Sequence, residues 1–160
     1  MFRIHRDVRF SRDKRPYKEH AACQFRHRLG RDVHAPGFYV HLAPGEVFFG
    51  GGMWMPEADA LLRIRTHIVA KPAAWKKVVT DKAFVAAFGG VEGEGLTRPP
   101  KGFDPAHPFI EDLKRKSFVA TRISSERTAC EPAFVNEVVE GFRALTPLMR
   151  FLCAALDVPY

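Results

Sequence analysis

The segment from Arg6 to His20 has the highest density of charged side chains in the chain. Arginine guanidinium groups bind phosphate or carboxylate through paired hydrogen bonds, and lysines add point charge. Acidic neighbours orient such arginines or, in an enzyme, act as acid or base. We therefore take the cations, acids and phenol of this segment as candidate ligand-binding residues: Arg6, Asp7, Arg9, Asp13, Lys14, Tyr17 and Lys18.

Three further cations and a glycine run complete the candidate site. Arg65, Lys101 and Lys116 lie in later segments that could converge on the first one. The backbone at Gly51 and Gly52 could approach an anion closely because glycine has no side chain. Three consecutive glycines in a strand also indicate a bulge against a bulky neighbour, and we consider this the simpler interpretation.

The charged cluster is open to three interpretations. In the first, Asp7 and Asp13 lock Arg6, Arg9 and Arg65 in an ion-pair lattice within a structural or partner-binding protein. In the second, the cluster binds a small anionic ligand or substrate that bears phosphate or carboxylate. We take the second as the best functional hypothesis. Whether the chain is an enzyme stays open, because no nucleophile–base–orienter set is recognisable.

Nucleic acid is the third interpretation and the alternative to a small anion. Phe10, Tyr17 and Trp54 stand beside basic residues and could stack on bases. The charge distribution also fits, because residues 1–34 hold ten of the 25 Lys and Arg but only four of the 18 Asp and Glu. The net charge of the chain is +7. No recognised nucleic-acid-binding motif is present.

The cysteine, histidine and hydropathy patterns bear on metal binding, on the cellular compartment and on membrane insertion. The three cysteines lack metal-ligand spacing and the seven histidines form no His-x-x-x-His pair, so we expect no metal and assign no cofactor. An odd number of cysteines without a recognisable spacing is typical of a protein from a reducing compartment. No apolar run approaches the roughly 18 residues that a spanning helix needs, and no signal peptide precedes the domain. We predict a cytoplasmic protein without a membrane partner.

The hydrophobic periodicity predicts a single α+β domain over residues 1–160, in which helices pack a mostly antiparallel sheet. Residues 21–29 could form a further strand, and the long connection 89–108 has the length of a functional loop. The strands of the sheet are expected at 2–10, 38–43, 46–54 and 117–123, with 38–54 as a hairpin. The main helices are expected near 57–70 and 132–156, with shorter ones at 74–79, 84–88 and 109–113.

Two arginines fall where the periodicity would bury them. Arg6 lies on the apolar face of the first strand, and Arg65 lies in the apolar stripe of the helix 57–70. The strand face consists of Phe2, Ile4, Val8 and Phe10, and the stripe of Ala58, Leu61, Leu62, Ile68 and Val69. Burying an unpaired charge costs several kcal/mol. We therefore predict that both guanidinium groups approach one polar centre, with Asp7 or Asp13 as counter-charge.

Six stretches carry a resemblance to a known family: residues 2–18, 37–42, 50–56, 98–103, 113–118 and 147–152. The first, Phe-Arg-Ile-His-Arg-Asp-Val-Arg-Phe-Ser-Arg-Asp-Lys-Arg-Pro-Tyr-Lys, is long and specific. Over essentially its whole length the chain resembles the uncharacterised family catalogued as domain of unknown function 2461. The resemblance implies an α+β domain and no particular activity. Members usually carry a helical segment before the arginine-rich strand, so we expect this chain to be N-terminally incomplete and less stable than an upstream-extended version.

Overall fold

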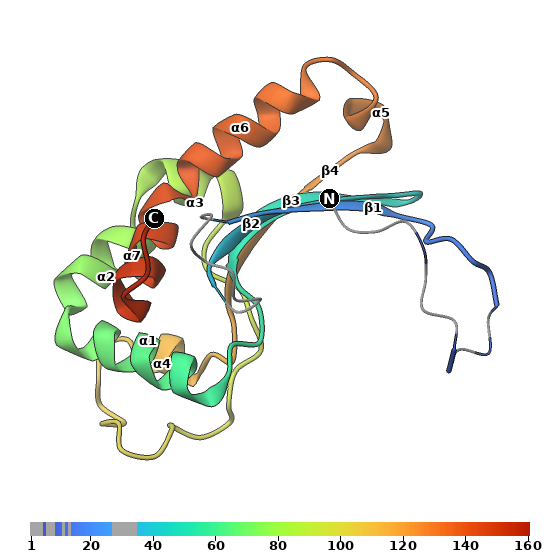
Figure 1. Cartoon of the computed structure of the whole chain (residues 1–160). Coiled ribbons are helices and arrows are strands. Elements are labelled where there is room, and N and C mark those ends of the chain that lie inside the picture. The colour runs from blue at the N-terminus through green and yellow to red at the C-terminus, as the bar shows by residue number, and fades with distance from the viewer. Residues whose placement is uncertain (1–4, 6–8, 11, 13, 27–34) are drawn as a thin grey trace.

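The structure is a computed structural model that describes residues 5, 9–10, 12, 14–26 and 35–160. Four strands form one antiparallel sheet in the order β1-β2-β3-β4, and helices pack against it (Figure 1). The strands are β1 (Ala21–Phe25), β2 (Gly37–Ala43), β3 (Glu46–Met53) and β4 (Phe118–Ser124). The predicted α+β class and mostly antiparallel sheet are confirmed.

The helices gather over one face of the sheet, where α6 crosses the strands and α1, α2 and α7 pack together at one end (Figure 1). Among the described residues no helix is long and apolar enough to span a membrane. The helices are α1 (Ala58–Ala70), α2 (Pro72–Val79), α3 (Lys82–Phe88), α4 (Ile110–Lys114), α5 (Glu126–Ala129), α6 (Phe134–Ala144) and α7 (Thr146–Leu156).

The hairpin of β2 and β3 confirms the strand pair expected over residues 38–54. Its turn contains Gly45, whose φ of +77° is a conformation that glycine adopts without strain. Alternate side chains of the two strands enter the core, and Phe49 at its centre is fully buried. The core of the protein therefore lies between this hairpin and the helices that cover it.

The helix α1 buries only part of the expected stripe. Ile68 is fully buried as expected, whereas Leu62 and Val69 are 52% and 41% exposed. Ile64, which is outside the expected stripe, is fully buried. Arg65 is 8% exposed, so the prediction that it is buried is confirmed. The periodicity gives the helix and its approximate apolar side, but the contacts of α1 with α7 and α2 decide which residues face the core.

The first expected strand, 2–10, is not seen among the described residues. His5 forms an isolated antiparallel bridge with Tyr17, and Phe10, expected on the apolar face, lies at a bend and is 95% exposed. The remaining members of that face, Phe2, Ile4, Arg6 and Val8, lie outside the described residues. The edge of the sheet beside β2 is occupied by β1 instead, which pairs over five residues from Ala21 to Phe25.

The connection between α3 and α4 is anchored to the segment that leads into β4. The Lys116 amide donates to the Glu94 carbonyl oxygen over 2.7 Å, and the Leu96 amide to that of Lys114 over 2.8 Å. Farther along the connection, Pro100 is buried and Phe103 packs against the core. These contacts fix residues 92–96 beside residues 114–119.

Candidate functional site: a buried arginine at the end of α4

Arg65 projects from α1 to the C-terminal end of α4. Its Nη2 donates a hydrogen bond to the carbonyl oxygen of Arg115 over 2.9 Å, and Arg115 is the C-cap residue of α4. Carbonyl groups at a helix C-terminus lack intrahelical donors and carry partial negative charge. The guanidinium therefore satisfies one of these carbonyl groups, and this contact ties α1 to α4.

The rest of the Arg65 guanidinium lacks hydrogen-bond partners and a counter-charge among the described residues. Its Nε is buried and has no hydrogen-bond partner, and no carboxylate of the described residues forms an ion pair with it. Burial lowers the pKa of Arg65 below its ordinary value, because the charged form loses hydration. A buried cation of this kind is stabilised by any anion that reaches it.

The nearby carboxylate of Asp112 is already engaged. Its Oδ2 accepts a hydrogen bond from the indole Nε1 of Trp75 over 2.9 Å, and its Oδ1 accepts from Nε of Arg115 over 3.0 Å. Trp75 is fully buried, so this bond satisfies a donor that has no access to water. Asp112 thus neutralises the Arg115 side chain rather than that of Arg65.

The loop between β3 and α1 is fixed beside the same segment. The amide of Met55 donates to Oγ of the buried Ser117 over 2.9 Å, two residues beyond Arg115. Met55 has a φ of +46°, which is uncommon for a residue other than glycine and tends to occur at functional sites. Trp54 beside it is 72% exposed. The family-like stretches 50–56 and 113–118 therefore meet next to Arg65.

Of the other cations expected at the site, only Lys116 comes near Arg65 through described contacts. Lys116 directly follows Arg115, and its Nζ donates to Oε2 of Glu94 over 3.4 Å. Lys101 is exposed in the connection before α4. No described contact joins Lys101 to Arg65.

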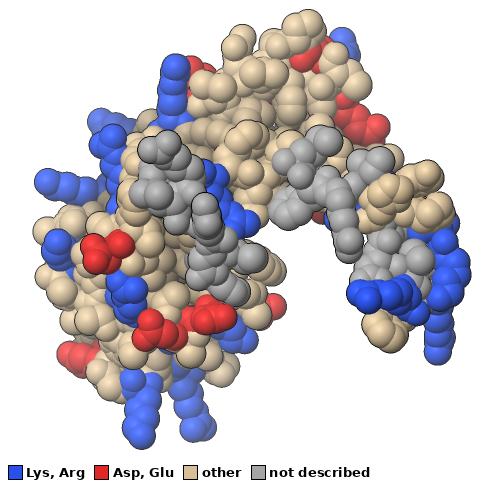
Figure 2. All heavy atoms as spheres, viewed as in Figure 1, with Lys and Arg blue, Asp and Glu red and all other residues tan. Residues whose placement is uncertain are grey.

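The described cations of the first segment lie away from Arg65. Figure 2 shows Lys and Arg gathered at the end of the arm formed by the first residues, away from α1. Arg9 and Lys14 are exposed, Lys18 is half-buried, and Tyr17 is 57% exposed with its ring beside that of His5. The remaining candidates, Arg6, Asp7 and Asp13, lie outside the described residues, so the predicted shared centre of Arg6 and Arg65 stays a prediction.

The glycine run has a packing role within the sheet. A Cβ at Gly52 would lie 2.1 Å from the carbonyl oxygen of Phe118, and one at Gly51 would lie 3.1 Å from that of Gly37. These are close approaches between neighbouring strand backbones, which glycine permits because it has no side chain. The geometry supports the simpler interpretation of the run and leaves its role in ligand binding a prediction.

One polar cluster was not expected from the sequence. The phenol of Tyr39 and Nδ1 of His41 lie 3.1 Å apart, and Nε2 of His41 lies 3.7 Å from Oε2 of Glu46. The His41 ring stacks between His20 and Phe48. Burial and the charge of Glu46 raise the pKa of Tyr39. Alternation along β2 puts Tyr39 and His41 on one side of the strand, but their partners come from other segments.

Among the described residues no group of three His, Cys, Asp or Glu could hold a metal ion.

Comparisons with known proteins give a family and no named relative. No curated protein and no solved structure matches the chain. A family model described as "Conserved hypothetical protein (DUF2461)" matches residues 1–151 of the 160. The chain belongs to this family, as the six stretches that resemble it indicated.

Proposed function

We propose that this protein binds a small anion that bears phosphate or carboxylate through the guanidinium of Arg65. The observation that carries the proposal is a buried guanidinium whose Nε has no partner and which forms no ion pair with a described carboxylate. A guanidinium offers paired N–H donors that match two oxygens of such an anion. A bound anion would replace the hydration that the charged guanidinium loses on burial.

Local contacts favour a ligand over an internal lattice at this position. Arg115 and Lys116 already have acidic partners in Asp112 and Glu94, so these two carboxylates are already paired with other cations. Lys116, with 41% of its side chain exposed, would add positive charge at the edge of the site. The first-segment cations and Lys101 stay predicted contributors, because no described contact brings them to Arg65.

The small exposed surface of Arg65 favours a small anion over nucleic acid. Nucleic-acid backbones are bound by several cations that are exposed together, and their affinity falls steeply with salt. Arg65 is 8% exposed, and the exposed cations at the arm of the first segment lie away from it. Oligonucleotide binding that is lost in moderate salt and retained in Arg65→Met would favour the arm as a nucleic-acid site instead.

The test is the unfolding temperature in phosphate and in chloride at equal ionic strength. A ligand at about 100 times its dissociation constant stabilises the folded state by about 2.7 kcal/mol. For a chain of this length that amounts to about 5–10 °C. We expect phosphate, or a small dicarboxylate such as succinate, to raise the unfolding temperature of the wild type by a saturable amount of this size.

Arg63→Met is the matched control for Arg65→Met. Arg63 lies on the same helix and has the same charge, but it is exposed. The proposal predicts a full anion effect in Arg63→Met and none in Arg65→Met. An equal shift in all three proteins would reflect a general salt effect and would contradict the assignment.

A further inference from the structure

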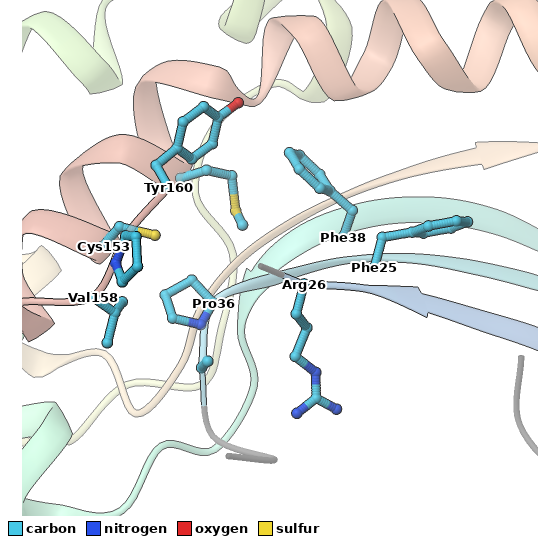
Figure 3. A pocket seen from close by; sticks show the side chains of 10 residues that line it. Phe25, Arg26, Pro36, Phe38, Cys153, Val158 and Tyr160 are labelled. Carbon is cyan, nitrogen blue, oxygen red and sulfur yellow. The ribbon is translucent and has the colours of Figure 1, made fainter. Parts of the chain in front are cut away.

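A pocket separate from Arg65 lies where the end of β1 and the start of β2 face α7 and the C-terminal segment (Figure 3). Its volume is about 240 Å³. Most of the described side chains that line it are apolar, and they include Phe38, Met149 and Val158. An apolar ligand group that enters such a pocket leaves water and displaces water from these surfaces, and both changes favour binding.

The aromatic walls of the pocket are held by contacts behind them. The ring of Phe38 stacks on that of Phe142 with centroids 4.5 Å apart, and Phe25 contacts Phe142 edge-on at 5.9 Å. On the opposite wall, the hydroxyl of Tyr160 donates to Oγ1 of Thr146 over 3.2 Å. These contacts fix the rings before any ligand arrives, which lowers the entropy cost of binding.

The polar groups of the described lining are engaged elsewhere or are uncharged. The guanidinium of Arg26 lies away from the rings of Phe38 and Tyr160 and donates to the amide oxygen of Gln24 over 2.5 Å (Figure 3). Burial raises the pKa of the Cys153 thiol, so this thiol stays protonated at neutral pH. The described lining therefore offers no counter-charge to a group inside the pocket.

The absence of a counter-charge decides which ligands the pocket accepts. An ionised carboxylate or ammonium that enters an apolar pocket loses its hydration, and this loss is costly unless a partner of opposite charge replaces the water. The guanidinium of Arg26 is directed elsewhere and does not supply that partner. An uncharged ligand of the same shape avoids the cost and keeps the benefit of apolar contact.

We propose that this pocket binds an uncharged compound built on a single hydrocarbon ring with a short arm, and that the ring lies among Phe38, Met149 and Val158. The volume sets the size, because a cavity of about 150 Å³ accommodates benzene and drug-sized ligands need about 300 Å³ or more. A ring with an arm of about three carbons lies between these limits. The ligand class and the site both differ from those of anion binding at Arg65.

The first experiment compares 3-phenyl-1-propanol with 3-phenylpropionate by calorimetric titration of the wild-type chain at pH 7. The two compounds share one carbon skeleton and differ in charge. We expect saturable binding of the alcohol with a dissociation constant of about 1 mM or below. The acid should bind at least about tenfold more weakly, because its carboxylate loses hydration without gaining a partner. Equal or tighter binding of the acid, or no saturable binding of the alcohol, would overturn the proposal.

The second experiment places the alcohol in the pocket by NMR of the wild-type chain. We expect nuclear Overhauser effects from the ring protons of bound 3-phenyl-1-propanol to the methyl groups of Met149 and Val158, which line the pocket. The methyl groups of Val135, which is 66% exposed on α6, serve as the reference and should show none. Effects to methyl groups outside the pocket without effects to Met149 and Val158 would refute the site.

Three variants complete the design. Val158→Trp fills the pocket with a larger side chain and should abolish binding of the alcohol, whereas Val135→Trp should not. Circular dichroism checks that both variants fold, and the NMR experiment tests the site in the wild type whatever the stability of Val158→Trp. Arg65→Met should bind the alcohol with unchanged affinity, which separates this pocket from the proposed anion site. Retained binding in folded Val158→Trp, or lost binding in Arg65→Met, would contradict the assignment.

Discussion

The guanidinium of Arg65 caps the C-terminal end of α4 through a hydrogen bond of 2.9 Å to the carbonyl oxygen of Arg115. A cation near a helix C-terminus is favourable because it faces the negative end of the helix dipole. This contact uses one N–H group, and the buried Nε of the same side chain has no partner. Arg65 thus combines a structural contact with an unused donor.

Replacing Arg65 by methionine should cost little stability. The change leaves the Arg115 carbonyl oxygen without its donor, which costs about 1–3 kcal/mol, and it also removes a desolvated charge, which offsets part of that cost. Breaking a buried ion pair would cost about 3–5 kcal/mol. We therefore expect a loss of free energy of unfolding below about 2 kcal/mol in denaturant titrations.

The exposed position Arg63 gives the reference for that measurement. Arg63→Met removes the same charge from the same helix and should change stability by no more than about 0.5 kcal/mol. A loss of 3 kcal/mol or more in Arg65→Met would indicate a stranded carboxylate. Such a result would support the lattice interpretation of the charged cluster against ligand binding.

Local patterns in the sequence predict the regular elements well. The alternation of β2, the Pro44-Gly45 turn and the proline before α1 placed the hairpin and the first long helix close to their observed bounds. The four-residue helix α5 was missed, because one turn is too short to show a helical period. The strand expected at 2–10 is wrong at Phe10, which is exposed and not on a buried face. Alternation alone does not say whether a partner strand is available.

The candidate site was predictable only in part. A charged residue within an apolar helical stripe correctly marked Arg65 as buried. Its partner is the backbone carbonyl of Arg115, 50 residues away. Every residue has such a carbonyl group, so this acceptor cannot be recognised from the sequence. The bond between Met55 and Ser117 was not predicted either, because its donor is the backbone amide of Met55, which every residue but proline carries. Such contacts depend on how α1, α4 and the loop before β4 pack, and no local pattern encodes that.

Gly52 should be intolerant of a side chain. Its φ of +129° is a conformation that other residues rarely adopt, and an added Cβ would lie 2.1 Å from the carbonyl oxygen of Phe118 in β4. We expect Gly52→Ala to cost about 3 kcal/mol or more through strain and separation of the two strands. Circular dichroism during denaturation measures the loss.

Gly95→Ala is the control for this prediction. Gly95 has no positive φ, and the nearest atom to an added Cβ there would be Cβ of Lys114 at 3.9 Å. Its replacement should change stability by no more than about 0.5 kcal/mol. Similar stability of the Gly52→Ala and wild-type proteins would show that the close approach of β3 and β4 is not required.

The histidine His67 should make the protein less stable in mild acid. Burial, and secondly the charge of Lys71, lower the pKa of His67 below its ordinary value of 6.5, and its ring packs edge-on against Phe151 at 4.8 Å. The unfolded chain therefore binds a proton that the folded chain resists. The stabilisation is complete above pH 6.5 and is lost as the pH falls from there through the folded-state pKa.

Denaturant titrations of the wild type and of His67→Gln across this range measure the effect. The variant carries no titrating group at this position, so its stability should fall less between neutral pH and pH 5. The difference between the two curves isolates His67 from the other histidines. Parallel curves would show that His67 titrates normally in the folded protein.

The central claim, that Arg65 receives an anion, is tested most directly by the NMR signal of its Nε–H group during a phosphate titration. The resonance is assigned by its absence in Arg65→Met, and Arg63, exposed on the same helix, serves as the internal reference. The account predicts a saturable downfield shift of the Arg65 Nε proton at constant ionic strength, with little change at Arg63, because a donor without a partner gains an acceptor. An Arg65 resonance that stays unmoved up to saturating phosphate and succinate would contradict it.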